Sequence, residues 1–373
     1  MASAALRQPR PSINVTPPNR FAPHSPEDSV TDRPFPRKST RIDPRLPWLA
    51  ETRRFLSPMA GVTDRAFRTV CRRFGADMGF CEFVSATGLT YGGENSWRLV
   101  DTDGEEGLVG VQIFGADPAH MAEAARLLAG HRMDVLDINF GCPVKKVVRK
   151  CGGSALLADV PLLANIVRSV MAESRVPVTA KIRTGWDEAS VNYREVGLLL
   201  QELGVPWVTL HGRTRAQKYK GQANWDRIAD LVETLAIPVI GNGDVVDGQS
   251  YRRLVAHTRC HGVMVARGAI GNPWLFAEMK AVDEGRDHTP PSFSAMCHVM
   301  IEHIRGEVAG KGERIGSQSV RKHLAGCFKG RPGAANLRRR IFAQETSAAM
   351  IAVLESAALR GEPALVGDSR REG

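Results

Sequence analysis

Two cysteines, Cys142 and Cys151, lie in the stretch DINFGCPVKKVVRKCGGSALL, which is otherwise rich in glycine and lysine. A thiol can bind a metal, form a disulfide, pack as a small apolar group or take part in chemistry. The chain of 373 residues has seven cysteines, no C-x-x-C pair and no continuous apolar leader. We therefore expect free thiols in a reducing, cytoplasmic environment, and no metal site.

Short β-rich runs alternate with amphipathic segments from Phe55 onward, and the pattern repeats eight times. The runs are nearly continuous apolar stretches, as expected for strands that are buried on both faces. They occupy residues 55–61, 78–88, 108–115, 135–143, 176–185, 207–214, 237–245 and 261–271. Eight strand–helix units predict a (β/α)8 TIM barrel, a fold of the α/β class. The alternative is a doubly wound open sheet, but no G-x-G-x-x-G follows the first run.

Polar residues stand at the carboxyl ends of the predicted strands, where a barrel of this kind has its active site. Taken alone, each has an ordinary explanation: Gln112 as a loop residue, His211 as a packing residue, Lys181 as a surface cation. Their common position in the repeat favours a site instead. These strand-end residues are Pro58, Met59, Ala60, Glu82, Gln112, Asn139, Cys142, Lys181, Arg183, His211, Arg213, Asn242, Gly243, Asp244, Ala266 and Arg267.

The last two repeats end in GNGDV and VARGAIGNP. Their glycines let main-chain N–H groups approach a phosphate, which barrels often bind at this place; the alternative is that they only form tight turns. Arg267 could add a bidentate contact to the phosphate. A buried Lys181 needs a partner, and Gln112 could bind the amide-like edge of a ring. Together these features indicate flavin mononucleotide (FMN).

Several segments resemble signatures of the tRNA-dihydrouridine synthases, flavin-dependent enzymes that reduce uridine in tRNA. They are SPMAGVTDRAFR, INFGCPVKKV, GSALL, AKIRTGWD, TLHGRTRAQKYKGQANW, VIGNGDV, RGAIGNPWLF and, near the C-terminus, RKHLAGCFKGRPGAANLRR. The resemblance covers roughly residues 54–350 and is closest to the bacterial branch, which has GCPVKKV. It implies a TIM barrel followed by a small all-helical C-terminal domain, bound FMN, and NADPH or NADH as the reductant.

The resemblance also implies roles for the strand-end residues. Cys142 would be the catalytic acid that gives a proton to C5 of uracil, while reduced FMN gives a hydride to C6. A thiol with an ordinary pKa of about 8.5 holds its proton at neutral pH, as such an acid must. The implied FMN-binding residues are Pro58, Met59, Ala60, Gln112, Lys181, His211, Asn242, Gly243, Asp244, Ala266 and Arg267.

Cys151 stands at a departure from the family pattern, because this chain has CGGSALL where the family tends to show AGSALL. We expect Cys151 to be a bystander. The alternative is an oxidative disulfide with Cys142, which would require the loop to bring the two thiols together.

Basic residues at two places predict where RNA binds. The loop after Cys142 is rich in lysine and arginine, and residues 321–340 hold seven Lys or Arg and no acid. Either run could be an ordinary solvated surface. In a chain with a formal net charge of +10, they indicate contact with tRNA phosphates. The expected tRNA-contacting residues are Asn139, Lys145, Lys146, Arg149, Arg183, Arg213, Arg321, Lys322, Lys329 and Arg338.

The chain divides into four predicted parts: a disordered Pro/Arg-rich tail (1–50), an FMN-binding barrel (51–288), a helical tRNA-binding domain (289–360) and a flexible tail (361–373). Ten prolines in the first fifty residues favour disorder over a transit peptide. No apolar run approaches the ~18 residues of a membrane helix, and we expect a monomer. Two other functions fit part of the sequence: an FMN-dependent reductase of a small pyrimidine or enone, and a non-catalytic tRNA-binding protein.

Overall fold

Eight parallel strands close into a barrel in the computed structural model, which describes residues 37–148 and 152–361. The ring closes because β2 pairs with β4 on one side and with β1 on the other, and β1 pairs with β9. In order around the ring the strands are β1 (Arg54–Leu56), β2 (Met78–Phe80), β4 (Leu108–Phe114), β5 (Val135–Phe140), β6 (Val178–Arg183), β7 (Val208–His211), β8 (Val239–Asn242) and β9 (Gly262–Val265). The predicted TIM barrel is confirmed.

The second predicted strand is interrupted. Its first half is β2, and its second half is the short β3 (Val84–Ser85), which pairs with the end of β4. The helix expected after it is also split, into α2 (Ala86–Thr90) and α3 (Glu94–Leu99). The break contains Cys81 and Glu82, which are both buried, so it places a carboxylate at the carboxyl end of the barrel.

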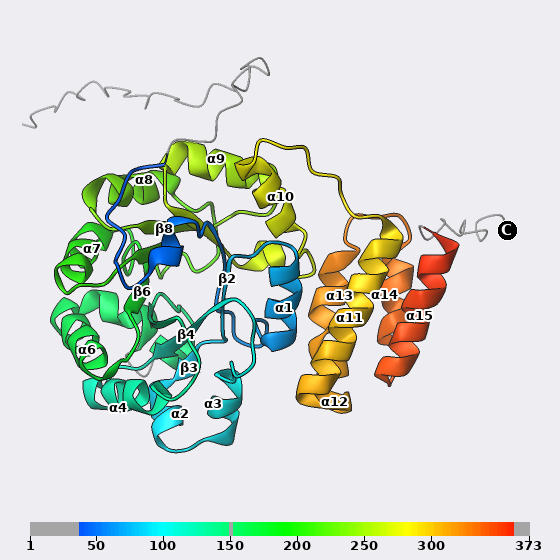
Figure 1. Ribbon diagram of the computed structural model, residues 1–373, viewed down its shortest axis with the longest axis horizontal. Coiled ribbons are helices and arrows are strands. Elements are labelled where there is room, and N and C mark those ends of the chain that lie inside the picture. The colour runs from blue at the N-terminus through cyan, green and yellow to red at the C-terminus, as the bar shows by residue number, and fades with distance from the viewer. Residues whose placement is uncertain (1–36, 149–151, 362–373) are drawn as a thin grey trace, which may run out of the picture. The chain divides into compact units, whose positions relative to one another are not determined.

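The remaining barrel helices surround the strands (Figure 1). Asp117 accepts hydrogen bonds from the main-chain N–H groups of Ala119 and His120, and it caps a helix whose first residue is Pro118. The helices are α1 (Arg65–Arg73), α4 (Pro118–Leu128), α6 (Val160–Glu173), α7 (Tyr193–Glu202), α8 (Trp225–Thr234), α9 (Gly248–Thr258) and α10 (Leu275–Asp283). Shorter turns are α5 (Lys145–Val148), η2 (Gly153–Ala158) and η3 (Arg267–Ala269).

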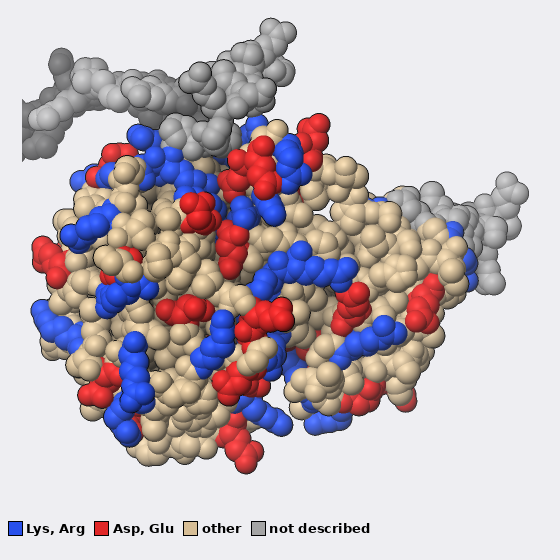
Figure 2. Space-filling view, in the orientation of Figure 1, with Lys and Arg blue, Asp and Glu red and all other residues tan. Residues whose placement is uncertain are grey.

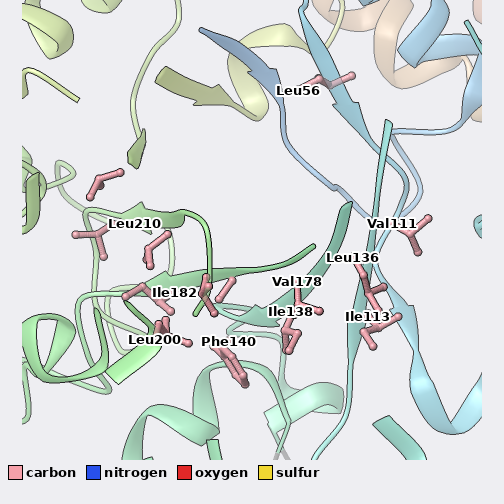
Figure 3. Packing of buried hydrophobic residues seen from close by; sticks show 14 of the residues in the cluster. Leu56, Val111, Ile113, Leu136, Ile138, Phe140, Val178, Ile182, Leu200 and Leu210 are labelled. Atoms are coloured by element: carbon pink, nitrogen blue, oxygen red, sulfur yellow. The ribbon is translucent and has the colours of Figure 1, made fainter. Parts of the chain in front are cut away.

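Side chains alternate along the central strands. Leu136, Ile138 and Phe140 of β5 pack in the layer between strands and helices, together with residues of β4, β6 and β7 (Figure 3). The intervening residues of β5, Asp137 and Asn139, make hydrogen bonds with polar side chains of the neighbouring strands. Along β5, the face toward the helices is therefore apolar, whereas Asp137 and Asn139 place polar groups in the barrel interior.

The amino end of the barrel is closed by residues 37–50, which include η1 (Pro47–Ala50). Leu46 and Leu49 are buried in a cluster with strand residues such as Phe55, and Trp48 meets Trp207 edge-on at a centroid distance of 6.1 Å. In Figure 1 this dark blue segment crosses the near end of the barrel. On the same side in Figure 2, basic and acidic side chains are interspersed, so the net positive charge is not concentrated there.

We expected the disordered tail to extend to residue 50, but residues 37–50 are packed against the barrel. Arg37 donates hydrogen bonds to the carbonyl oxygens of Cys260 and His261, at 2.9 and 3.0 Å, and pairs with Asp283 at 3.0 Å. The apolar residues that follow cover the strand starts, a burial that composition alone does not reveal. Residues 1–36 and 362–373, which hold the rest of the predicted tails, lie outside the described residues.

Five helices follow the barrel, and we call residues 293–360 the helical domain. They are α11 (Phe293–Lys311), α12 (Glu313–Ser319), α13 (Arg321–Cys327), α14 (Ala334–Phe342) and α15 (Ser347–Arg360). The helices share a core that includes Cys297, Met300 and Phe328, and α11 packs against α1 of the barrel. Among the described residues, no helix combines the length and apolar character needed to cross a bilayer.

We predict that Leu49→Ala destabilises the protein by about 2–5 kcal/mol, because it leaves a cavity in the closed end of the barrel. Leu49 is fully buried, whereas Leu359 is 90% exposed, so Leu359→Ala is a control expected to change stability by less than about 0.5 kcal/mol. Urea unfolding of both variants measures the difference. If Leu49→Ala and Leu359→Ala were equally stable, residues 37–50 would have no structural role.

Candidate active site

A hydrogen-bonded chain of polar side chains crosses the barrel interior. Asn139 donates to Gln112 at 2.7 Å, Gln112 donates to Asp137 at 2.6 Å, and Thr179 donates to the other oxygen of Asp137 at 2.5 Å. Gln112, Asp137 and Thr179 are fully buried. Burial raises the pKa of Asp137 to about 6, although the hydrogen bonds from Gln112 and Thr179 act in the opposite direction. Gln112 is thus locked in one orientation.

Lys181 lies beside this chain, in register with Asn139 of β5. Its ammonium donates to the amide oxygen of Asn242 at 2.9 Å, and Asn242 donates to the carbonyl of Met264 at 2.7 Å. Burial lowers the pKa of Lys181 to about 7, and repulsion from Arg183 adds to the effect. Among the described residues Lys181 has no ion pair within 4.0 Å. The site therefore offers a half-buried cation to a ligand.

Four cations surround His211 at the end of β7. Burial holds the pKa of His211 well below its usual value, and the charges of Arg183, Lys181, Arg213 and Arg267 lower it further. His211 is therefore neutral at physiological pH, and the barrel mouth, meaning the carboxyl ends of the strands, is positive. Asp244 offsets part of this charge, since it pairs with Arg213 at 2.6 Å and lies 3.7 Å from Arg267. The remaining charge suits an anion such as phosphate.

The chain after β8 passes very close to β7. Gly243 has a φ of +130°, and a Cβ atom there would lie 2.6 Å from the Cβ of Ala223. Only glycine fits this conformation and this gap. Arg267 follows β9 in η3 with its side chain 56% exposed, and its guanidinium lies 4.9 Å from the ring centre of Tyr219. The main chain after β8 and the exposed guanidinium of Arg267 are therefore both available at the predicted phosphate site.

Cys142 lies on a loop that is fixed from both sides. Asn139 accepts hydrogen bonds from the main-chain N–H groups of Gly141 and Cys142, at 3.0 and 2.8 Å. Arg183 donates to the carbonyl of Gly141 at 2.7 Å, and the hydroxyl of Ser154 donates to the carbonyl of Cys142 at 2.9 Å. Burial raises the pKa of the Cys142 thiol, so it keeps its proton at neutral pH.

The loop after β1 joins the barrel to the helical domain. It carries Pro58, Met59 and Ala60 and continues to Gly61, whose N–H donates to Glu82. Lys322 of α13 donates to the carbonyl of Gly61 and to the hydroxyl of Ser319. A residue predicted to contact tRNA thus touches the loop predicted to hold FMN.

The other predicted tRNA-contacting residues are more scattered. Arg183 and Arg213 are each 2% exposed and donate to main-chain carbonyls, so they hold loops in place. Arg321 donates to the carbonyl of Gln344, whereas Lys329 is exposed and Arg338 is half-buried on the helical domain. Lys145 and Lys146 lie in α5, directly after the Cys142 loop, and Arg149 and Cys151 lie outside the described residues.

Sequence reasoning missed two residues of the buried chain, Asp137 and Thr179. Both lie in mid-strand, away from the strand ends that we searched. The alternation of apolar and polar residues in LDINF was the available signal, since a carboxylate within a buried strand needs partners.

An eight-stranded parallel barrel with polar and cationic side chains at the carboxyl ends of its strands is the architecture of the TIM-barrel enzymes. The chain belongs to the dihydrouridine synthase (Dus) family, whose profile matches residues 55–361. The family predicted from the sequence is confirmed.

Relatives with similar sequences cover most of the chain. It is 38% identical to tRNA-dihydrouridine synthase B of Pasteurella multocida over 281 residues, which are 75% of this chain and 85% of that protein. It is 36% identical to tRNA-dihydrouridine synthase B of Xanthomonas axonopodis pv. citri, over 84% of this chain and 96% of that one. It is also 36% identical to probable tRNA-dihydrouridine synthase 1 of Synechocystis sp., over 89% of this chain and 91% of that protein.

We predict that Lys181→Met flattens the pH dependence of stability in the ligand-free protein. Lys181 has a pKa of about 7 when folded, against 10.5 for the free side chain, so the unfolded state binds more protons between these values. The wild type should therefore lose roughly 1–3 kcal/mol relative to the variant as the pH falls from about 9 to about 7. Thermal unfolding at both pH values measures this.

Lys280 is an exposed lysine of α10, so Lys280→Met serves as the matched control. Its stability should depend on pH as that of the wild type does. If the stability of Lys181→Met depends on pH as that of the wild type does, burial does not destabilise the Lys181 ammonium.

Proposed function

We propose that the chain is a tRNA-dihydrouridine synthase that reduces the C5–C6 double bond of uridines in tRNA with a flavin cofactor. Membership of the Dus family and the names of the relatives support this activity. The observation that carries it is the fixed, protonated thiol of Cys142 at the mouth of a positively charged barrel. A positioned acid and a site for an anionic cofactor are the two features that this reduction requires.

The residues of the barrel mouth fit FMN. Lys181, whose ammonium donates to the neutral side chain of Asn242, would hold the electron-rich edge of the flavin ring, and the locked side chain of Gln112 would help to orient it. The main chain of Gly243 and the guanidinium of Arg267 would hold the phosphate. Reduced flavin bound there would supply the hydride for C6 of uracil. Neutral His211 would line the site without adding charge.

The remaining FMN-binding assignments follow from the same positions. Asn242 holds Lys181 in place, and Asp244 holds Arg213 and the main chain of Ala223. We infer that Ala266 and the loop carrying Pro58, Met59 and Ala60 contact the flavin through their main chain.

Cys142 would give its proton to C5 of uracil. The hydrogen bonds from the loop to Asn139 keep the thiol in one place, which general acid catalysis requires. The charges of Arg183 and Lys181 favour the thiolate that remains, and solvent would then restore its proton. The exposed fraction of Cys142 is 7%, so the acid is shielded from water until the substrate base arrives.

The tRNA would bind across the barrel mouth and the helical domain. Its target base must leave the stack to reach the flavin, at a cost of a few kcal/mol that contacts to the RNA must offset. We infer that Lys145, Lys146, Arg149, Arg321, Lys322, Lys329 and Arg338 supply phosphate contacts, whereas Asn139, Arg183 and Arg213 act by holding loops. NADPH or NADH as the reductant, a monomeric state and a cytoplasmic location are further predictions.

The alternative function is an FMN-dependent reductase of a small pyrimidine or enone. It would share every barrel residue described above but would have no use for the basic helical domain. The contact between Lys322 of that domain and Gly61 of the barrel favours the tRNA substrate.

We predict that Cys142→Ala lowers the rate of dihydrouridine formation in tRNA by about 10²–10⁴-fold, the usual contribution of a general acid. FMN binding and NADPH oxidation should persist, because the thiol holds no part of the flavin. Dihydrouridine in unmodified tRNA would be measured by mass spectrometry, with FMN fluorescence as the test of binding.

Cys297→Ala is the control, because Cys297 is buried in the helical domain, far along the chain from the site. Wild-type rates in Cys142→Ala would contradict the acid assignment. Reduction of free uridine but not of tRNA would instead support the alternative function.

We predict that Arg338→Ala weakens tRNA binding and lowers the slope of log Kd against log salt concentration by about 1, because one phosphate contact is lost. Arg126→Ala, which removes an exposed arginine of α4, should leave the slope unchanged. Fluorescence anisotropy with labelled tRNA at several salt concentrations measures both. An unchanged slope for Arg338→Ala would place the tRNA elsewhere.

A further inference from the structure

Three buried side chains converge where the helical domain meets the barrel. His303 and Glu307 lie one turn apart on α11, and His323 comes from α13. Their exposed fractions are 1%, 1% and 0%, and one ligand-type atom from each lies within 4.8 Å of the others. Phe67 of α1 covers the pair of imidazoles, with its ring centre 4.2 Å from that of His323. Figure 1 shows α1 beside these helices.

The cluster contains polar atoms without adequate partners. Within the described residues, neither ring nitrogen of His323 and neither of His303 makes a hydrogen bond of acceptable geometry. The nearest approach is His303 Nε2 to Glu307 Oε1, at 3.5 Å, which is at the outer limit for such a bond. Each buried polar group left in this state costs about 1–3 kcal/mol. A ligand that binds all three side chains would remove this cost.

The charges around the cluster leave room for a cation. Lys311 lies 2.9 Å from Glu307 Oε2 and also pairs with Asp64, so two carboxylates share one ammonium. Lys322 is also nearby, but its ammonium donates to Gly61 and Ser319. Oε2 of Glu307 is thus occupied by Lys311, while Oε1 faces the imidazoles.

Close backbone packing holds Glu307 in place at the cluster. A Cβ atom at Gly316 of α12 would lie 2.7 Å from the carbonyl group of Glu307, so α11 and α12 are in direct backbone contact at the cluster. Glu307, Asp64 and Lys311 also line a cleft of about 1380 Å³ that includes residues of α1, α3 and α11.

We propose that His303, Glu307 and His323 form a binding site for a divalent transition-metal ion, best suited to zinc, that ties α11 and α13 together against α1. Two imidazoles and a carboxylate are a known zinc ligand set, with bond lengths of about 2.0–2.2 Å, and water would complete the tetrahedron. Lys311 and Asp64 act behind Glu307 and orient it. The site is separate from the barrel mouth and does not depend on the proposed function.

This proposal differs from our expectation of no metal site, which no observation contradicts. That expectation rested on the absence of paired cysteines, whereas this ligand set contains no cysteine. The H-x-x-x-E spacing in α11 was visible, but the contribution of His323 depends on how α13 packs.

The test is metal binding by the full-length protein, prepared without a histidine tag. After exposure to zinc and extensive dialysis, the wild type should retain one zinc per chain, measured by mass spectrometry. Cobalt(II) in place of zinc should give the visible absorption of a four-coordinate ion. His323→Gln and Glu307→Gln should weaken cobalt binding by more than about tenfold. His298→Gln changes an exposed histidine of the same helix and should bind as the wild type does.

Two results would overturn the site: no retained zinc and no four-coordinate cobalt spectrum in the wild type, or equal loss of binding in His298→Gln and His323→Gln. Circular dichroism checks that each variant is folded. If a variant does not fold, X-ray absorption spectroscopy of zinc in the wild type tests the site instead. The spectrum must show two imidazole ligands, and a spectrum without them would overturn the site.

Discussion

The hydrogen-bonded chain from Thr179 through Asp137 and Gln112 to Asn139 is the constraint on which the rest of the site depends. Buried polar groups must find partners inside the protein, and here they find them in one another, across three adjacent strands. The strand register is set accordingly, and the last member of the chain, Asn139, also binds the loop that holds Cys142. The position of the thiol is therefore determined by contacts that begin deep inside the barrel.

The amino end of the barrel contributes mainly to stability, whereas the carboxyl end carries the residues of the candidate site. At the amino end, Leu46 and Leu49 cover the strand starts with apolar surface. From the middle of the strands to their carboxyl ends, burial disfavours charged groups: it raises the pKa of Asp137 and Cys142 and lowers that of Lys181 and His211. The closed end stabilises the fold, and the mouth can therefore keep cations that are poorly compensated until a ligand binds.

The sequence was informative where a residue's role follows from its place in a repeat. The alternation of β-rich and amphipathic segments, and the lengths of these segments, predicted eight strand–helix units. The positions at the strand ends indicated Gln112, Lys181 and Cys142 as site residues, and the structure brings these three residues to one region. It was uninformative where a role depends on contacts distant in sequence. The packing of residues 37–50, the burial of Arg183 and Arg213, and the meeting of His303 with His323 all depend on segments that only the folded chain brings together.

The bond from Lys322 to the carbonyl of Gly61 has a thermodynamic consequence. An RNA phosphate that recruits Lys322 must compete with that carbonyl, and a flavin that tightens the loop after β1 must alter the same bond. Whatever one ligand does to the affinity of the other, the second must do equally to the first. Under the proposed function, filling one site therefore changes the affinity of the other, and Lys322, a side chain of the helical domain, is one link between them.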